Sequence, residues 1–262
     1  MPKAYEEIAD DLRRSIRDGA REPGDRLPSE ADLSRHYGRS LPTVQSALRV
    51  LSEEGLIDKR PGLGTFVRRP RTLTVRGNGR HQWEKNRARQ HETVRARTGV
   101  TEHDTGLCRD DLVFSARYRE VEASEELAGL FGVAVGTPLL ERTYRTRCAT
   151  ETAPLNLVTS YLVRDMIAAN PDLLDETKEP WPGGTQHQLS TVGIELDRIE
   201  ERCTARPPTP EEAKALELSG GTSVILLRKT SYDIDGRVVD LSLVTLPGDR
   251  TELVFTTCLE RW

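Results

Sequence analysis

The sequence predicts an α+β protein built from two domains, and three observations lead to this prediction. First, 262 residues are more than the ~100–200 residues that one domain usually contains. Second, residues 4–55 place apolar side chains at helical spacing, interrupted by proline and glycine. Third, short strand patterns and short helix patterns follow one another from about residue 111, which predicts a mixed α/β domain with an antiparallel sheet.

The first two helices are predicted from an apolar stripe and from the residues that interrupt it. Over residues 4–18 the stripe consists of Tyr5, Ile8, Ala9, Leu12 and Ile16. The run REPGDRLPSE (21–30) then ends the helix. Ser29, followed by Asp32, is typical of an N-cap with a carboxylate in the first turn. Gly38 ends this second helix and allows the turn into a third.

The third helix is expected to have two chemically different faces. Ser40 is a good N-cap, Pro42 is tolerated in the first turn, and Gly55 ends the helix. One face is an apolar stripe of Val44, Ala47, Leu48 and Leu51. The other face carries hydrogen-bonding side chains near its N-terminal end, namely Thr43, Gln45, Ser46 and Arg49. After the helix, LIDKRPGLGTFV (56–67) has two short β-prone runs around Pro61–Gly64, which is typical of the wing of a winged helix-turn-helix.

These three helices and the hairpin resemble the DNA-binding domain of GntR-type bacterial transcription regulators. The resemblance covers residues 4–68 and rests on the order and spacing of PGDRLPSE, TV..AL..L..EGLI and G.GTFV. An alternative is a helix bundle that binds other proteins through ordinary solvated faces. In such a bundle the wing glycines would have no purpose.

Roles for the polar residues follow from the way such a domain binds DNA. The first residues of the third helix meet base edges in the major groove. Gln45 can pair with adenine through two hydrogen bonds, and Arg49 can reach guanine or a phosphate. The wing glycines allow a close approach to the minor groove. We therefore expect DNA contacts from Ser29, Glu30, Arg39, Ser40, Leu41, Thr43, Gln45, Ser46, Arg49, Lys59, Arg60, Gly62 and Gly64.

Two of these positions depart from the family pattern. Many relatives carry arginine where this chain has Leu41 and Gln45. Without these two guanidinium groups, guanine or phosphate contacts are lost, and a preference for an A·T pair at one position is plausible. Leu41 can contact a thymine methyl group instead.

Residues 70–110 are predicted to form a basic linker between a winged helix-turn-helix domain (1–69) and a C-terminal domain (111–262). The net charge of −4 is unevenly distributed. Residues 70–109 contain nine lysines and arginines against four acidic residues, whereas 110–262 contain 16 against 26. We therefore expect nucleic-acid contact at the N-terminal end only. The linker arginines are either solvated or contact phosphates beside the operator.

The C-terminal domain contains an internal repeat. EASEELAGLFGVAVGTPLLERTYRT (122–146) parallels PTPEEAKALELSGGTSVILLRKTSY (208–232), helix for helix and strand for strand. Such a repeat predicts a pseudo-symmetric sheet with a cleft, where a ligand commonly binds. Over residues 112–258 the chain resembles the UTRA effector domain of the HutC branch, whose fold is chorismate-lyase-like. The resemblance implies a homodimer in which a small-molecule effector changes the affinity for DNA.

The effector site is expected on polar residues of this domain. Carried over from the family, the candidates are Arg142, Arg145, Ser160, Thr185 and Asp240. The alternatives are that the arginines are solvated, that Thr185 is only an N-cap, and that Asp240 pairs with Arg237. Relatives that bind sugar phosphates often have glutamate at Val158, so a more apolar ligand is conceivable here.

The function expected from both halves is a ligand-responsive repressor that an effector releases from a palindromic double-stranded DNA operator. Two alternatives stay open: an enzyme of chorismate-lyase-like fold tethered to DNA, and a constitutive dimeric repressor without effector. The sequence lacks the motifs GxSxG, HExxH and GxxxxGK, which argues against an enzyme. Four scattered cysteines without CxxC predict no metal site, and we expect no cofactor. No apolar stretch reaches ~18 residues, so we expect a cytoplasmic protein without membrane contact.

Overall fold

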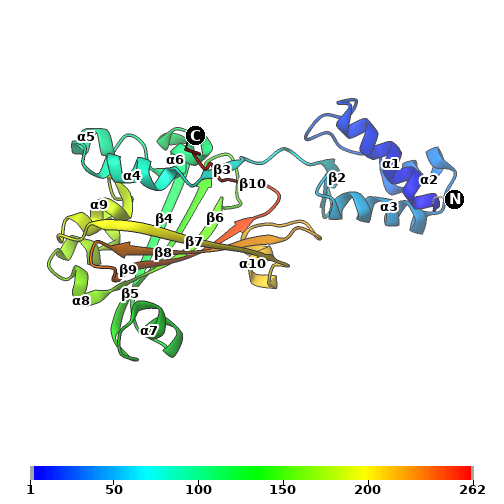
Figure 1. Cartoon of the computed structure of the whole chain (residues 1–262). Helices are drawn as coiled ribbons and strands as arrows, with labels where there is room; N and C mark the ends of the chain where they lie inside the picture. Colours follow the sequence, from blue (N-terminus) through cyan, green and yellow to red (C-terminus); the bar gives the residue numbers. More distant parts are fainter. Residues whose placement is uncertain (1–2, 261–262) are drawn as a thin grey trace. The chain divides into compact units, whose positions relative to one another are not determined.

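A computed structural model describes residues 3–260. The chain divides into two compact units: residues 1–71 together with 207–223, and residues 72–206 together with 224–262 (Figure 1). Within the described residues, no helix combines the length and the apolar character needed to cross a membrane.

The N-terminal unit contains the three predicted helices and the hairpin. They are α1 (Ala4–Arg17), α2 (Glu30–Tyr37), α3 (Leu41–Glu53), β1 (Ile57–Arg60) and β2 (Gly64–Val67). Ser29 is the N-cap of α2, and its hydroxyl accepts a hydrogen bond from the Asp32 amide. Gly38 ends α2 in the left-handed conformation, at φ +61°, where a residue with a Cβ would be strained.

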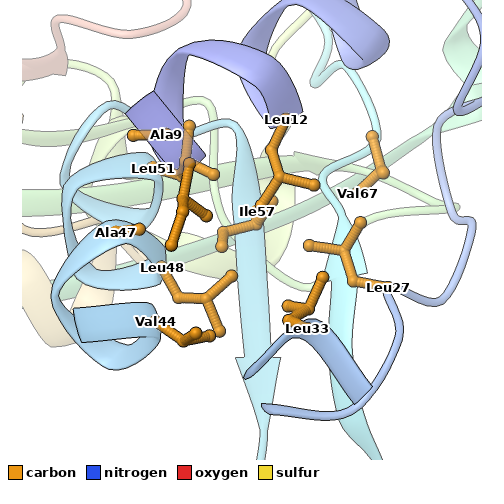
Figure 2. Packing of buried hydrophobic residues seen from close by; sticks show 11 residues of the cluster. Ala9, Leu12, Leu27, Leu33, Val44, Ala47, Leu48, Leu51, Ile57 and Val67 are labelled. Carbon is orange, nitrogen blue, oxygen red and sulfur yellow. The ribbon is translucent and has the colours of Figure 1, made fainter. Parts of the chain in front are cut away.

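The core of this unit is formed by the apolar stripes of its helices. Val44, Ala47 and Leu51 of α3 are completely buried, and they pack with Ile8, Ala9 and Leu12 of α1 (Figure 2). Leu27, Leu33, Ile57 and Val67 complete the cluster. Because this stripe anchors α3, the opposite face of the helix is left at the surface.

The hairpin is antiparallel and has a short tip. Ile57 pairs with Val67 and Arg60 pairs with Gly64, which leaves residues 61–63 as the turn. Gly64 has φ +119°, and a Cβ there would lie 2.8 Å from Nε of Arg26. The left-handed conformation therefore favours glycine at Gly64, whereas the exposed Arg26 side chain could move to make room for a Cβ.

The second unit is built on an antiparallel sheet with the order β4-β5-β6-β9-β8-β7. These strands are β4 (Leu112–Glu122), β5 (Pro138–Cys148), β6 (Asn156–Val163), β7 (Leu196–Arg206), β8 (Val224–Asp233) and β9 (Val238–Pro247). The internal repeat is visible in this order, because β4-β5-β6 and β7-β8-β9 meet at the β6–β9 pair. Helix α7 (Glu125–Phe131) precedes β5, as α10 (Pro210–Ala215) precedes β8.

The two faces of this sheet carry different helices. Leu140 faces a cluster that includes Leu189 of α9 (Gly184–Ser190) and Ile167 of α8 (Arg164–Ile167). Its neighbour Leu139 faces the opposite cluster, which includes Phe131 of α7. Figure 1 shows α7 on one side of the sheet and α9 on the other. The short 3-10 helices η2 (Pro171–Leu174) and η3 (Glu176–Lys178) join α8 to the loop before α9.

The prediction of a linker over residues 70–110 is wrong for most of that segment. It contains β3 (Thr74–Gly77), α4 (Arg80–Ala88), α5 (Glu92–Arg95), α6 (Val100–Thr105) and η1 (Arg109–Asp111). Strand β3 pairs in parallel with β10 (Thr251–Val254), a partner far away in the sequence. The helices are short and polar and are held by contacts such as Arg80 to Asp104 at 3.0 Å, so they leave no apolar periodicity in the sequence.

Candidate DNA interface and ligand cavity

The polar residues predicted on the third helix lie at the surface. Gln45 and Arg49 are exposed and Thr43 and Ser46 are half-buried, so none of the four is packed inside. Leu41, at the start of α3, is 46% exposed. The hydroxyls of Ser40 and Thr43 lie 2.8 Å apart, and the hydroxyl of Ser46 donates to the carbonyl of Pro42. The N-terminal end of α3 thus presents hydrogen-bonding groups on an anchored helix.

Glu30 connects this helix to the hairpin. The amide nitrogen of Gln45 donates to Oε2 of Glu30 at 2.7 Å, and Nζ of Lys59 donates to Oε1 at 2.8 Å. The contact with Lys59, and then that with Gln45, lowers the pKa of Glu30 below its ordinary value. The carboxylate is therefore ionised at neutral pH.

The remaining predicted DNA contacts lie near the ends of α2 and on the hairpin. Ser29 is exposed, and its hydroxyl donates to Oδ2 of Asp32 at 2.6 Å. Arg39 lies 3.3 Å from Glu7, and both side chains are about half exposed. Arg60 stacks its guanidinium over the ring of Phe66, 4.7 Å from the centroid. These side chains are all accessible, and their ion pairs are of the weak, solvated kind.

The second unit contains a cavity of about 670 Å³. It lies between the sheet face that carries Leu140 and the helices α4, α6 and α9. Its volume is in the range of small-molecule sites. One part of the wall is aromatic and aliphatic: Trp83, Leu112, Phe114, Tyr144, Val158, Trp181 and Val244. Another part is charged or polar: Arg76, Arg80, His81, Glu84, Ser160, Glu179, Gln188, Lys229 and Ser242.

A single row of polar residues crosses the sheet beneath this cavity. The strand register aligns one residue from each strand, in the order Tyr118, Arg142, Ser160, Ser242, Lys229 and Glu201. Because directly paired residues project to the same face, the six side chains form one line. The repeat makes Arg142 the counterpart of Lys229, since each pairs with one of the two central serines.

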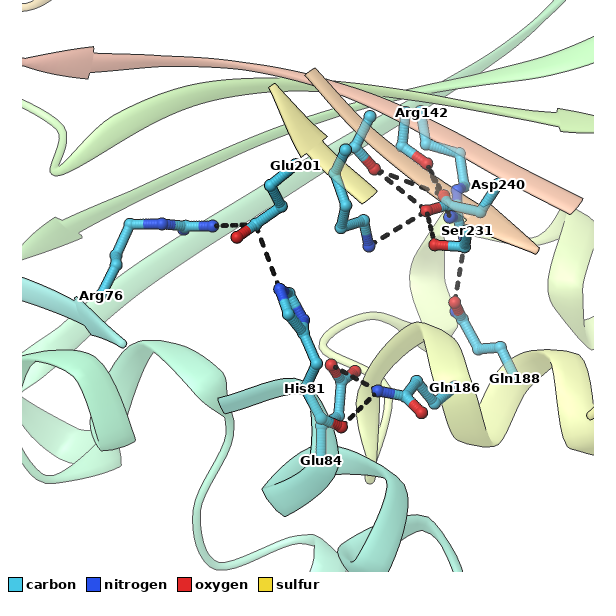
Figure 3. A network of polar contacts seen from close by, with 12 residues as sticks. Arg76, His81, Glu84, Arg142, Gln186, Gln188, Glu201, Ser231 and Asp240 are labelled. Carbon is cyan, nitrogen blue, oxygen red and sulfur yellow. Dashed lines mark hydrogen bonds and ion pairs between the residues drawn. The ribbon is translucent and has the colours of Figure 1, made fainter. Parts of the chain in front are cut away.

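Asp240 joins the two cations of this row. Its carboxylate lies 3.4 Å from Arg142 and 3.0 Å from Lys229, and it accepts a hydrogen bond from Ser160 at 2.8 Å (Figure 3). Asp240 and Arg142 are both fully buried, with 0% and 1% of the side chain exposed. Burial opposes ionisation of Asp240, but Lys229 and Arg142 outweigh it and hold the pKa below its usual range. Arg142 also donates to Gln188 of α9 at 2.7 Å.

A second polar cluster lies at the Glu201 end of the row. Arg76 contacts Glu201 at 3.3 Å, and Nε2 of His81 lies 3.1 Å from the same carboxylate oxygen (Figure 3). Burial by itself raises the pKa of Glu201, but His81 and Arg76 lower it to about 2. Arg76 and Arg80 are each 8% exposed, and Nε of each has no hydrogen-bond partner within residues 3–260.

Four of the five predicted effector residues lie at or next to the cavity, and the fifth, Arg145, does not. Ser160 and Thr185 line the cavity. Arg142 and Asp240 are buried and are not part of the cavity wall, but both contact Ser160, and Arg142 contacts Gln188, which do line it. Asp240 pairs with Arg142 and Lys229, whereas Arg237 pairs with Asp233.

Arg145 does not line the cavity, so the prediction that it belongs to the effector site is wrong for this cavity. It is exposed and is not part of the cavity wall. Arg142 and Arg145 are three positions apart on β5, and side chains alternate between the two faces of a strand, so both cannot face the same cavity. The sequence pattern ERTYRT placed two arginines close together but not on one side.

Sequence reasoning missed several cavity residues, and one of them left a partial signal. Lys229 pairs with Ser242 as Arg142 pairs with Ser160, but the aligned repeat segments place Arg228 opposite Arg142, so the repeat pointed only to the neighbouring position. Arg76, Arg80 and Trp83 line the cavity but lie in the predicted linker and carry no motif. Their position depends on the β3–β10 pairing, which no local pattern indicates.

An anchored helix with a polar outer face and a wing, together with a cavity on a separate sheet domain, defines a DNA-binding regulator with a ligand-binding domain. Comparisons with known proteins agree. Residues 4–67 match the family model of bacterial regulatory proteins of the gntR family, and residues 116–252 match the UTRA domain.

Two relatives match over nearly the whole length, and a third matches over about a quarter of it. The HTH-type transcriptional regulator SCO4628 of Streptomyces coelicolor is 31% identical over 252 residues, which cover 95% of this chain and 91% of that protein. The HTH-type transcriptional repressor NagR of Bacillus subtilis is 24% identical, with 95% and 93% covered. The histidine utilization repressor of Klebsiella aerogenes is 42% identical over 67 residues, which cover 26% of this chain and 28% of that protein.

A solved structure shares the fold of both units. The crystal structure of a GntR-family transcriptional regulator matches with a TM-score of 0.60 and 24% identity, covering 98% of each chain. The chain belongs to the GntR family of bacterial transcription regulators, with a UTRA domain as in the HutC-like branch. The fold predicted from the sequence is therefore confirmed.

Proposed function

We propose that this protein is a homodimeric repressor that binds a palindromic operator and is released when a small molecule enters the cavity of the second unit. The observation that carries the DNA-binding half is the anchored α3, whose apolar stripe is buried while Gln45 and Arg49 remain exposed. In this binding mode the start of α3 enters the major groove and the hairpin approaches the backbone and minor groove. Relatives named as repressors support the direction of the response.

The chemistry of the cavity supports an effector that carries an anionic group on an apolar body. Arg142 and Lys229 share one carboxylate, Asp240, so these three side chains together retain one net positive charge, and Lys229 carries it to the cavity wall. Ser160 and Ser242 lie between the two cations and line the cavity, and their hydroxyls donate to Asp240. Beside this polar row, on the same face of the sheet, Val158 pairs with Val244 and the aromatic rings of Phe114 and Tyr144 lie 5.9 Å apart.

Operator release follows from linkage between the two sites. If the effector binds the DNA-free form better than the DNA-bound form, DNA must weaken effector binding by the same factor. A coupling of ~1–3 kcal/mol would change operator affinity about 5- to 150-fold. That range is sufficient to switch a repressor.

The proposal is tested with the full-length protein and two kinds of binding measurement. Thermal shift against a panel of small anions identifies ligands, because saturation at 100 times the dissociation constant adds roughly 2.7 kcal/mol of stability. Fluorescence anisotropy on the preferred duplex from a randomised pool then measures affinity with and without the ligand. We expect weaker binding with ligand. A duplex affinity that no stabilising ligand changes would contradict release by an effector, and binding without sequence preference would contradict the repressor itself.

A further inference from the structure

The contact between Glu30 and Gln45 determines which way the amide of Gln45 points. Glu30 is the first residue of α2, and 27% of its side chain is exposed. Its two carboxylate oxygens are used separately: Oε2 accepts from Nε2 of Gln45, and Oε1 accepts from Nζ of Lys59. An ionised carboxylate can only accept hydrogen bonds, so it holds the nitrogen of the Gln45 amide and repels the oxygen.

The amide held in this way has a defined pattern of free groups. A glutamine side chain has two N–H donors and one oxygen acceptor. One donor of Gln45 is used by Glu30, which leaves one N–H and Oε1 directed away from the carboxylate. Gln45 itself is exposed on the outer face of α3, where a base edge would lie in the DNA complex.

One donor beside one acceptor matches adenine and not guanine. Adenine offers an acceptor at N7 and a donor at N6, whereas guanine offers acceptors at both N7 and O6. Against guanine, Oε1 of Gln45 would face O6, and two acceptors repel. A glutamine that is free to rotate avoids part of this penalty by presenting its second N–H, but the amide held by Glu30 cannot.

We propose that Glu30 is a positioning residue that sets the base preference of Gln45, by orienting its amide for adenine in each half-site. This inference rests on the proposed DNA-binding function. Glu30 touches no base in this arrangement; it acts through Gln45. Lys59 donates to the other oxygen of Glu30, so it does not compete with Gln45 for Oε2.

The test compares base preference, not overall affinity, because removing an acidic side chain near DNA strengthens binding to every sequence. A randomised duplex pool selected with the full-length protein gives the preferred duplex. Pairs of duplexes that differ by a single A·T to G·C change are then measured for the wild type and the variants. Gln45→Ala identifies the position that Gln45 reads, because the preference disappears there and remains elsewhere.

Glu30→Gln is the decisive variant. The neutral amide can donate as well as accept, so it no longer forces the orientation of Gln45. We expect the preference for A·T over G·C at the Gln45 position, roughly 5- to 150-fold in the wild type, to fall at least about threefold, while preferences at other positions stay unchanged. Glu30→Ala should lower it similarly.

Two controls separate this role from charge and from loss of Lys59. Glu54→Gln removes the same charge from the C-terminal end of α3, where the carboxylate contacts Arg13 and not Gln45. Lys59→Met keeps the Glu30–Gln45 contact. Both should retain the adenine preference, and thermal unfolding of each variant checks that the domain is folded.

Two results would overturn the inference. One is a full adenine preference in folded Glu30→Gln; the other is a Gln45→Ala variant with unchanged preference at every position. Neither result affects the proposed function. The proposed function fails separately, if the wild type selects no preferred duplex from the pool.

Discussion

The polar side chains of the two units are held in opposite ways. In the DNA-binding unit, Gln45, Arg49 and Lys59 are at the surface and their partners are few and solvated. In the ligand-binding unit, Arg142 and Asp240 are fully buried and have several partners each, although Nε of Arg142 has no hydrogen-bond partner among the described residues. A surface that must adapt to DNA keeps side chains that move at little cost, whereas a cavity that must select one small ligand keeps a rigid polar floor.

The largest expected effect is the loss of specific DNA binding when the polar side chains on the outer face of α3 are removed. Replacing Thr43, Gln45, Ser46 and Arg49 together by alanine should lower affinity for the preferred duplex by roughly 10³-fold or more, toward non-specific binding. Anisotropy titration measures this. Because none of the four is buried, the unfolding free energy should change by less than about 1 kcal/mol. Undiminished duplex affinity would show that this face does not read DNA.

The next largest effect concerns Asp240, the buried carboxylate that contacts both Arg142 and Lys229 in the second unit. Asp240→Asn leaves Arg142 and Lys229 without a carboxylate, and breaking a buried ion pair in this way costs about 3–5 kcal/mol. Urea unfolding followed by the fluorescence of Trp83 and Trp181 reports on this unit. Asp235→Asn is the matched control, since that side chain is 65% exposed. Equal stability of the two variants would show that the ion pairs of Asp240 do not stabilise this unit.

A smaller effect is expected from acid, through Glu201. Its folded pKa of about 2 lies below the ordinary value of 4.5, so its contribution to stability is complete above pH 4.5 and is lost as the pH falls toward 2. Glu201→Gln should therefore flatten the decrease in unfolding free energy between these pH values. Thermal unfolding at a series of pH values measures it. An identical slope in the variant would mean that other carboxyls cause the acid sensitivity.

The smallest effect is expected at Arg145. Because it lies on the face of β5 away from the cavity, Arg145→Ala should leave ligand binding unchanged and alter stability by no more than about 0.5 kcal/mol. Ser160→Ala, in the cavity wall, should lower the affinity for the ligand found by thermal shift. A ligand affinity that depends on Arg145 and not on Ser160 would reverse the assignment of faces.

Prediction from sequence succeeded where the signals were local. The caps at Ser29 and Gly38 and the stripe from Val44 to Leu51 lie within a few residues of the features they determine. It failed for residues 74–105, where short polar helices are held by ion pairs and by a strand partner near the C-terminus. Prediction of the candidate site was likewise only partly correct. Ser160 and Thr185 line the cavity, whereas Arg145 does not.

The sequence by itself determined the class of protein and the position of α3, the helix predicted to contact bases. Helical periodicity and capping depend on neighbours three or four positions apart. The sequence also contained the repeat from which the sheet is built. Only the tertiary structure decided which side chains meet in the cavity. Arg142 reaches Asp240 across 98 positions of the chain, and the face on which each strand residue lies depends on strand register, where a shift of one position reverses it.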